Sequence, residues 1–322
     1  MTATSFRAAV RHACVALAVV AVLAAALLTS CGGRKRSATI RISGAWALYP
    51  LAVAWADAYN KTHPDIRVDV SAGGAGKGMT DALTGLADLG MVSRAIAVEE
   101  TARGCAAIPV AKDAVVCIVN EKSPAAALLA KTGITRATCR GIWITTNITS
   151  WSGVVKGCPA APLYVYTRSD AAGAPETWAK YLGGQQSDLR GTGVSGDPGL
   201  VEAVRKDVNG IGYCNLNFAY DPASGKPVNG VMVVPLDANS NGMAEAAELL
   251  ATKKDAMRAI ALGVYPSPPA RDLYFVAKGW PKGAVAEFLL WAITDGQAMV
   301  EPTGYLAVTS NSLAEARAML KP

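Results

Sequence analysis

A regular alternation of short β-type and α-type segments constrains the fold of this 322-residue chain more than any other feature. Residues 38–43 alternate apolar and polar side chains, as a half-buried strand does, and Tyr49-Pro50 opens a helical pattern that runs to Tyr59. We then expect a strand at 66–70, a helix at 79–86 and a strand at 89–92. Strands that alternate with helices in this way form a parallel sheet covered by helices.

The same alternation returns later in the chain, after two apolar stretches at 106–110 and 114–119 that look like strands leaving the first unit. The expected helices are 125–142, 176–181, 198–208 (with Ser195 or Asp197 as its cap), 243–262 and 283–299. The expected strands are 163–166, 210–216, 232–235 and 273–277. This order predicts two lobes, the first built from 38–119 plus 263–322 and the second from 120–262. The crossings between them would form a hinge, with a cleft between the lobes.

The first thirty residues look like a secretory leader rather than part of the fold. Arg7 and Arg11 precede an apolar stretch at 13–28, which ends in Leu28-Thr29-Ser30-Cys31. The stretch is shorter than the roughly 20 apolar residues that span a membrane. Its ending resembles the bacterial lipobox, which implies that Cys31 is acylated; the alternative is an ordinary leader. We predict a lipoprotein signal peptide at 1–30, a tether at 31–37, and an exported, lipid-anchored protein that faces the periplasm or the cell exterior.

Composition excludes several classes of function. The net charge of +6 is small and diffuse, so we expect no nucleic-acid partner. The chain has two histidines, a count that disfavours histidine metal sites and Ser-His-Asp catalysis. No Cys-x-x-Cys pair exists among the cysteines after the leader, which are Cys105, Cys117, Cys139, Cys158 and Cys214. A disulfide between Cys139 and Cys158 is the first candidate in an oxidising compartment, and the alternative is five small buried side chains.

A glycine loop is the sharpest local candidate for an anion site. Gly74-x-Gly76-x-Gly78 follows a strand and precedes a helix, so its backbone N–H groups could face an anion. It is not a Walker loop, because Ser71 replaces the first glycine and Gly78 replaces the Ser/Thr. The alternative is a purely structural turn.

Arg168 begins a second candidate loop, which also lies between a strand and a helix. Asp170 is close enough in sequence to orient its guanidinium, although a surface ion pair is the alternative. Ser93-Arg94 ends another strand and would face the same cleft. The acidic pairs Glu99-Glu100 and Glu245/Glu248 look like solvated faces. No nucleophile with a base and no metal cluster accompany these groups, so we expect no enzyme, no cofactor and no metal.

Many short motifs in one order resemble the phosphate-specific ABC-transporter binding proteins, a branch of the type 2 periplasmic binding fold. Ala87–Arg94 is similar to the Asp-Ile-(Ala/Gly)-x-(Ala/Ser)-Ser-Arg strand of that family, and Pro109–Ala114 to its Pro-Val-Ala-Tyr-Asp-(Ala/Gly) crossing. The other matching segments are Ser43–Pro50, Ser71–Gly78, Ile148–Trp151, Gly210–Tyr213 and Leu273–Val276. The resemblance covers nearly the whole chain after the leader. It implies a two-lobed α/β fold, each lobe a mostly parallel sheet flanked by helices.

The departures from the family concern the groups that hold phosphate. The Ser-Thr of the first family loop falls on Trp46 and Ala47, and the Ser of the glycine loop falls on Ala75. The Ser-Gly-Thr that follows the arginine becomes Ala172-Gly173-Ala174. About four hydroxyl donors are therefore missing, each worth roughly 1.5–3 kcal/mol to a charged partner. Together they equal most of a micromolar affinity, which is about 8 kcal/mol.

The resemblance implies a monomeric receptor that captures a small-molecule ligand between its lobes and delivers it to an ABC-type or other membrane transporter. One hypothesis is that phosphate or another small oxyanion still binds, through backbone N–H groups. The other is a more apolar ligand, a lipid or a carboxylate-bearing organic molecule anchored by Arg168. An enzyme of this fold and an assembly role without a transported ligand are weaker readings. The implied ligand-binding residues are Trp46, Ala47, Ala75, Gly76, Ser93, Arg94, Arg168, Asp170, Ala172, Gly173 and Ala174.

Overall fold

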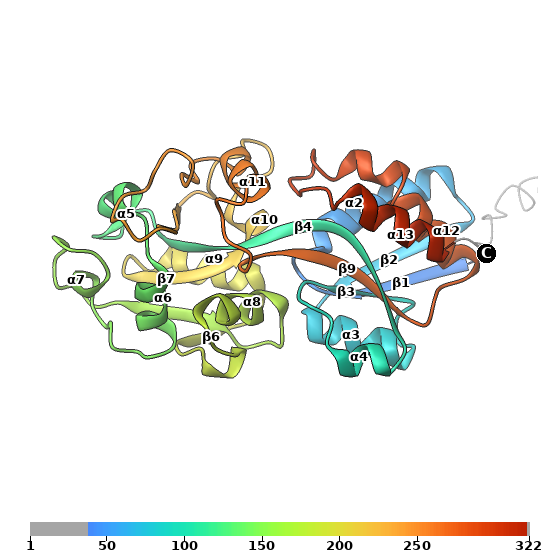
Figure 1. Cartoon of the computed structure of the whole chain (residues 1–322), viewed down its shortest axis with the longest axis horizontal. Coiled ribbons are helices and arrows are strands. Elements are labelled where there is room, and N and C mark those ends of the chain that lie inside the picture. The colour runs from blue at the N-terminus through green and yellow to red at the C-terminus, as the bar shows by residue number, and fades with distance from the viewer. Residues whose placement is uncertain (1–37, 321–322) are drawn as a thin grey trace, which may run out of the picture.

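The computed structural model describes residues 38–320, which form two lobes joined by two long strands (Figure 1). These connecting strands are β4 (Cys105–Asn120) and β9 (Ala270–Lys278), which pair antiparallel along most of β9. The predicted leader, Cys31 and the predicted tether lie outside the described residues. No helix among residues 38–320 has the length and apolarity needed to cross a membrane.

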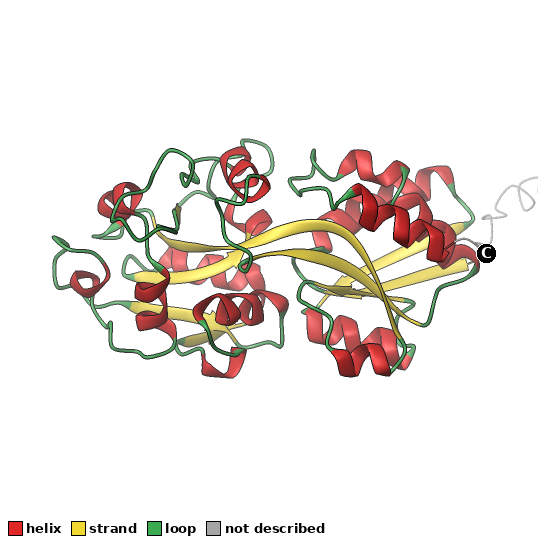
Figure 2. Ribbon diagram, in the orientation of Figure 1, coloured by secondary structure: helices red, strands yellow, loops and turns green. Residues whose placement is uncertain are grey.

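One mixed sheet runs through both lobes in the strand order β2-β1-β3-β9-β4-β7-β5-β6, with β8 paired to β4 (Figure 2). In the first lobe β1 pairs parallel with both β2 and β3, and in the second lobe β5 pairs parallel with both β6 and β7. The remaining strands are β1 (Ala38–Gly44), β2 (Ile66–Ala72), β3 (Leu89–Val92), β5 (Tyr164–Arg168), β6 (Thr192–Val194), β7 (Gly210–Asn215) and β8 (Val231–Val234). The predicted two-lobed α/β fold is confirmed.

Helices cover both faces of the sheet in each lobe (Figure 2). They are α2 (Tyr49–Thr62), α3 (Ala75–Thr84), α4 (Val98–Ala102), α5 (Ala126–Thr132), α6 (Arg136–Trp143), α7 (Trp151–Val154), α8 (Gly173–Leu182), α9 (Gly196–Lys206), α10 (Leu216–Ala219), α11 (Lys253–Ala261), α12 (Gly283–Ala292) and α13 (Ser310–Leu320). The 3₁₀ helices η1 and η2 span Gln186–Asp188 and Asp295–Met299.

The buried apolar side chains form two clusters, one on each side of the connecting strands. The first joins residues 40–111 to 273–320 and packs Trp55 and Phe288 against Phe275 of β9. The second spans residues 114–270, and in it Trp178 stacks on Tyr213. Each cluster removes its large aromatic side chains from water, which is the main driving force for forming a lobe.

The connecting strand β4 contains Pro109, which a central strand can hold only where the ladder is interrupted. The register of β4 against β9 shifts between Pro109 and Ala111, which marks a β-bulge. The bulge bends and twists the ribbon where it leaves the first lobe. The two apolar stretches predicted at 106–110 and 114–119 are therefore one continuous strand.

Three predicted helices differ clearly from the structure. The helix expected at 283–299 ends as α12 at Ala292, and the 3₁₀ helix η2 follows it. The helix expected at 125–142 is two helices, α5 and α6, because Gly133 adopts φ +66 and Thr135 caps the second one. The helix expected at 243–262 begins only at Lys253. Before it, the buried carboxylate of Glu248 accepts hydrogen bonds from the backbone of Ala238 and Glu245 and so stabilises a loop. The expectation of a solvated Glu248 is wrong for the same reason.

The five cysteines of the described chain are all buried and free, so the expected Cys139–Cys158 disulfide is wrong. Burial raises the pKa of the Cys139 and Cys117 thiols, which keeps them protonated. Such thiols act as small apolar side chains in the core.

Candidate functional site

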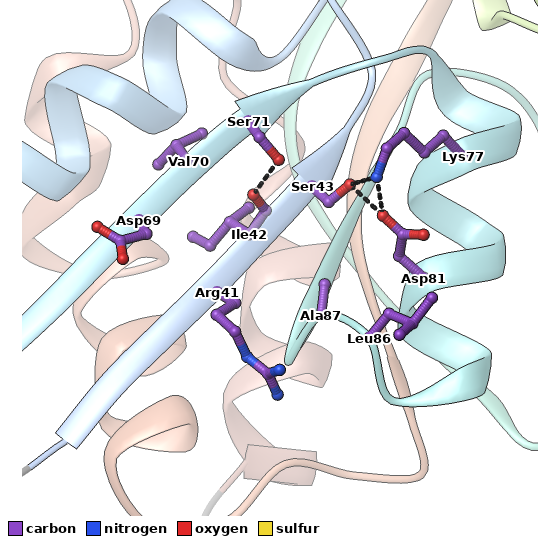
Figure 3. Close-up of a pocket in the computed structure, with 10 residues that line it drawn as sticks. All are labelled: Arg41, Ile42, Ser43, Asp69, Val70, Ser71, Lys77, Asp81, Leu86 and Ala87. Atoms are coloured by element: carbon purple, nitrogen blue, oxygen red, sulfur yellow. Dashed lines mark hydrogen bonds and ion pairs between the residues drawn. The ribbon is translucent and has the colours of Figure 1, made fainter.

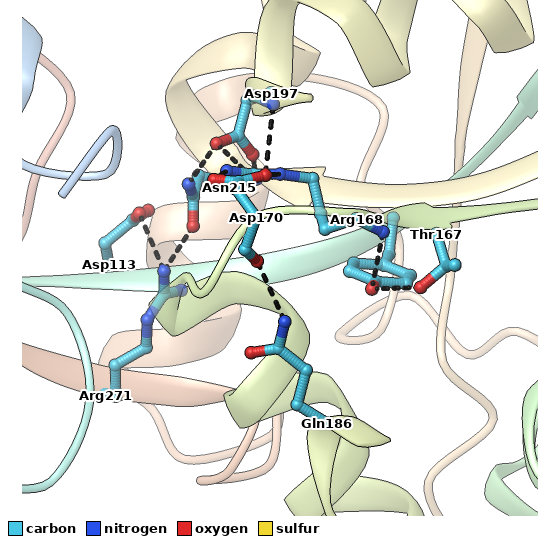
Figure 4. Close-up of polar contacts among 10 residues, drawn as sticks. Asp113, Thr167, Arg168, Asp170, Gln186, Asp197, Asn215 and Arg271 are labelled. Atoms are coloured by element: carbon cyan, nitrogen blue, oxygen red, sulfur yellow. Dashed lines mark hydrogen bonds and ion pairs between the residues drawn. The ribbon is translucent and has the colours of Figure 1, made fainter. Parts of the chain in front are cut away.

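Arg168, at the end of β5, is the charged centre of the site, and its side chain is fully buried (Figure 4). Its Nε and Nη2 atoms donate to Asp170 at 2.7 and 2.5 Å, and Nη1 donates to Asp197 at 2.7 Å. Burial alone would lower the pKa of the Arg168 guanidinium, but the charges of Asp197 and Asp170 raise it above its usual value. The predicted pairing of Asp170 with Arg168 is confirmed, and the guanidinium is locked in one orientation.

Both carboxylates that hold Arg168 are themselves fixed by the second lobe. Asp197, in the first turn of α9, accepts hydrogen bonds from the backbone N–H and the side-chain amide of Asn215, both at 2.8 Å. Asp170 accepts from the backbone N–H of Gly196 at 3.2 Å. Burial tends to raise the pKa of Asp170, and the hydrogen bonds and charge of Arg168 more than offset it, so the pKa lies below its usual value.

The glycine loop of the first lobe touches the loop after Arg168. The Gly76 N–H donates to the Ala171 carbonyl oxygen at 3.2 Å. Gly74 adopts φ +92, and a Cβ atom there would lie 2.7 Å from the same oxygen. A Cβ atom on Gly173 would lie 2.1 Å from the Ser93 hydroxyl. These glycines allow the two lobes to meet; we call the contact of residues 73–76 and Ser93 with residues 170–174 the seam.

Trp46 fills the space between the first lobe and the start of α9. A Cβ atom on Gly196 would lie 3.2 Å from the Trp46 indole. The ring also packs edge-on against Phe218 of α10, with centroids 6.2 Å apart. An indole therefore contacts the second lobe where the resemblance places a hydroxyl.

Of the four predicted alanines, Ala75, Ala172 and Ala174 belong to the seam, and all four are buried. Ala47 and Ala75 have no exposed surface, and Ala172 and Ala174 are at most 6% exposed. Ala172 is the N-cap residue of α8 and forms no side-chain capping bond. The Ala47 carbonyl accepts from the Tyr305 hydroxyl at 2.7 Å. The described seam thus carries methyl groups where the resembled family carries hydroxyls.

Arg94 crosses the seam as an ion pair instead of presenting a free charge. Its guanidinium donates to both oxygens of Glu100 at 2.6 and 2.9 Å, and its Nε lies 3.0 Å from Glu176 of α8. Burial raises the pKa of Glu176, and the charge of Arg94 only partly opposes this shift. Arg94 therefore links the lobes beside the site rather than joining Arg168.

A separate pocket of about 330 Å³ lies on the first lobe, between β1, β2 and α3 (Figure 3). Lys77 of the glycine loop contributes its ammonium here, where it donates to the Ser43 hydroxyl at 3.0 Å and pairs with Asp81. The Ser43 hydroxyl donates to Asp81 at 2.5 Å. The charge of Lys77 is thus compensated away from the seam. No cluster of three or more metal-ligating side chains occurs within residues 38–320.

Sequence reasoning missed two residues of this site. Asp197 was considered only as a helix cap, and Asn215 lies 18 residues further on, at the end of β7. An aspartate in a first helical turn also serves the helix dipole, so its residue type and position carry no sign of a distant arginine. The folded arrangement of α9 and β7 is what brings Asp197 and Asn215 to Arg168.

Comparison with known proteins agrees with this architecture. A family model described as a PBP superfamily domain matches residues 29–295. Protein SphX of Synechococcus elongatus is 29% identical over 251 residues, which is 75% of this chain and 71% of that protein. Phosphate-binding protein PstS of Bacillus subtilis is 26% identical over 283 residues, which is 86% of this chain and 83% of that protein. These names confirm the resemblance drawn from the sequence.

Among solved structures, an ABC-type phosphate transport receptor from Vibrio cholerae superimposes with a TM-score of 0.60 at 18% identity, covering 84% of this chain and all of that one. A Clostridium perfringens protein solved with bound phosphate, and named as a phosphate ABC transporter substrate-binding protein, gives a TM-score of 0.69 at 21% identity, with the same coverage. Both share the two-lobed fold. The match over most of its length shows that this chain belongs to the PBP superfamily.

Proposed function

We propose that this protein is an extracytoplasmic receptor that captures a small oxyanion, with phosphate as the first candidate, at the seam between its lobes. The observation that carries this proposal is the orientation of Arg168. Three of the five N–H donors of its guanidinium are taken by Asp170 and Asp197, which leaves two for a ligand. A guanidinium held in one orientation binds an oxyanion with little further loss of side-chain entropy.

The charge around Arg168 restricts which anion fits. Two carboxylates face one guanidinium, so the immediate surroundings carry a net negative charge. A carboxylate accepts hydrogen bonds and repels a bare anion, so a favourable ligand carries an acidic hydrogen as well as oxygen acceptors. Protonated phosphate has both. The phosphate-binding names of the relatives support the same class of ligand.

The assembly that we propose around this site follows the sequence predictions. The lobes comprise 38–119 plus 263–322 and 120–262, β4 and β9 act as the hinge, and the chain is a monomer. Acylated Cys31 holds the receptor at the membrane beside an ABC-type transporter. The two separate core clusters support the lobes. The proposed ligand set is the one predicted from the sequence, namely Trp46, Ala47, Ala75, Gly76, Ser93, Arg94, Arg168, Asp170, Ala172, Gly173 and Ala174.

A second candidate ligand, more apolar than phosphate, is favoured by Trp46. The indole faces Gly196 and Phe218, and the alanines of the seam are buried. A lipid or an organic carboxylate could pack against this surface and place its acid group on Arg168.

Titration calorimetry with phosphate at fixed salt tests the proposal. We expect a micromolar dissociation constant for the purified protein and a loss of binding in Arg168→Lys, which cannot keep the two-sided arrangement. The control is Arg205→Lys, in an exposed ion pair of α9. No binding at millimolar phosphate, together with an apolar acid that copurifies in native mass spectrometry, would replace phosphate with the second candidate.

A further inference from the structure

A second buried arginine, Arg271, lies in the connecting ribbon, where it directly faces Asp113. The two residues are register partners, Asp113 on β4 and Arg271 on β9. Asp113 is fully buried and the Arg271 side chain is 8% exposed. Both strands pass from one lobe to the other (Figure 1), and Arg271 faces Asp113 and Asn215 (Figure 4).

Arg271 contacts a residue of each lobe. Its Nε donates to the Ser93 carbonyl oxygen of the first lobe at 3.2 Å, and its Nη2 donates to the side-chain oxygen of Asn215 in the second lobe. Asn215 in turn donates to Asp197, which holds Arg168. A continuous chain of polar contacts thus runs from Ser93 to Arg168 through the hinge.

The ion pair between Arg271 and Asp113 is longer than the hydrogen bonds that Arg271 forms with Ser93 and Asn215. The closest approach of the two charged groups is 3.7 Å, between Nη2 of Arg271 and a carboxylate oxygen of Asp113. Neither oxygen of Asp113 receives a hydrogen bond of good geometry, and Nη1 of Arg271 donates none. Buried polar atoms are nearly always satisfied, so three such atoms at one point are unusual.

We propose that Arg271 is a positioning residue that couples closure of the two lobes to the placement of Arg168, and that Asp113 sets the strength of this coupling. Arg271 touches no ligand in this scheme. It ties the first-lobe carbonyl of Ser93 to the Asn215–Asp197 pair, so closure adds a first-lobe contact to the second-lobe residues that orient Arg168. The ligand half of this inference rests on the proposed function, whereas the closure half does not.

Protonation of Asp113 makes closure of the lobes depend on pH. Burial raises the pKa of Asp113 to about 6, and the charge of Arg271 opposes this only in part. The other charged groups that act on Asp113 are Asp197 from α9, which raises the pKa, and Lys253 from α11, which lowers it. Opening of the ribbon admits water to Asp113 and brings its pKa back towards the usual value. The closed form therefore holds the proton more tightly, and acidification from pH 7 to 5 favours closure.

Hydrogen exchange at the seam measures closure without any ligand, because the Gly76 N–H is bonded to Ala171 across it. In Arg271→Met we expect exchange of the 73–78 segment to rise at least tenfold, with α12 unchanged. Arg271→Lys, which keeps a donor, should recover part of the protection. The control, Arg205→Met, removes an exposed arginine of an intrahelical ion pair and should leave the seam unchanged.

The pH arm uses Asp113→Asn. After correction for intrinsic exchange, the protection of the 73–78 segment in the natural protein should increase as pH falls from about 6 towards 4, and this dependence should vanish in Asp113→Asn. Unchanged seam exchange in Arg271→Met and Arg271→Lys, or equal loosening of α12, would reduce Arg271 to a structural residue and overturn the inference. If Arg271→Met does not fold, Arg271→Lys and Asp113→Asn decide the question.

A phosphate titration of the same variants separates the two claims. If the natural protein binds phosphate, Arg271→Met should weaken binding at least tenfold while Arg205→Met does not. A natural protein that fails to bind phosphate but loses seam protection in Arg271→Met contradicts the proposed function alone.

Discussion

Arg168 and Arg271 both have buried side chains, and each faces a buried aspartate. Their surroundings nevertheless shift the pKa values of the two guanidinium groups in opposite directions. Well-formed hydrogen bonds to Asp170 and Asp197 raise the pKa of Arg168, and the pKa of Asp170 lies below its usual value. At the hinge, burial lowers the pKa of Arg271 and raises that of Asp113, because the pair lacks such bonds. The geometry of the hydrogen bonds, rather than the presence of an ion pair, decides whether a buried charge is stabilised.

The largest expected effect comes from removing the well-satisfied arginine. Arg168→Met leaves the buried Asp197 and the partly buried Asp170 without their cation, which should cost about 3–5 kcal/mol in the free energy of unfolding. Urea denaturation at pH 7 measures this loss. A loss below about 1 kcal/mol would contradict the comparison, because the Arg168 ion pairs would then stabilise the fold no more than exposed pairs do.

At the hinge, by contrast, we expect that removing a charge increases the free energy of unfolding. In the folded state the pKa of Asp113 is raised to about 6, so its ionised form destabilises the fold at neutral pH. Asp113→Asn should therefore raise the free energy of unfolding at pH 8, by on the order of 1–3 kcal/mol.

The stabilisation expected for Asp113→Asn can be tested by its dependence on pH. Because the folded protein holds the Asp113 proton more tightly than the unfolded chain, the gain in Asp113→Asn should shrink as pH falls from about 6 towards 4. Denaturation curves of both proteins across this range give the difference directly. Destabilisation by Asp113→Asn at pH 8 would contradict the comparison.

Ala172→Ser tests the capping of a helix at the seam rather than an ion pair. Ala172 is the N-cap of α8, has extended backbone angles and forms no capping bond. A serine hydroxyl there can accept from the first turn of the helix and should stabilise the protein by about 1 kcal/mol. Ala174→Ser, inside the same helix, is the control and should not stabilise it. The thermal midpoints of both variants provide the measurement.

The smallest effect is expected for the half-exposed ion pair across the seam. Glu176→Gln removes the second-lobe partner of Arg94, whereas Glu100 in the first lobe remains paired with it. Exposed pairs contribute about 0.2–1 kcal/mol, so overall stability should hardly change. Seam exchange should still rise slightly, and Glu202→Gln, in an intrahelical pair, should leave it unchanged.

Local patterns predicted the first lobe well, because its strands and helices are marked by side-chain alternation and by Pro and Gly at their ends. β3 occupies the four residues that were predicted, and α2 begins at the predicted Tyr49-Pro50. The helix prediction was wrong for 243–252, because the alanines of this segment favour a helix whereas the buried Glu248 carboxylate stabilises a loop. That choice depends on Ala238, a partner outside the segment.

The site was predictable only where its partners are close in the sequence. Asp170 lies two residues from Arg168, and the pair was found. Asp197 lies 29 residues away, and Arg271 is 56 residues from Asn215, so no spacing or periodicity connects them. Contacts of this kind arise only when separate helices and strands have packed, which is also why the crowding of Trp46 against Gly196 was invisible in the sequence.

The buried thiols divide between the two cores. Cys105 belongs to the first cluster, and Cys117, Cys139, Cys158 and Cys214 belong to the second. Each thiol can react with an alkylating reagent only after its own surroundings open, because neutral buried sulfur is inert. Alkylation followed by peptide mass analysis would therefore time the unfolding of each lobe separately in the natural sequence, with no label added, and would show whether the shared ribbon makes the lobes unfold together.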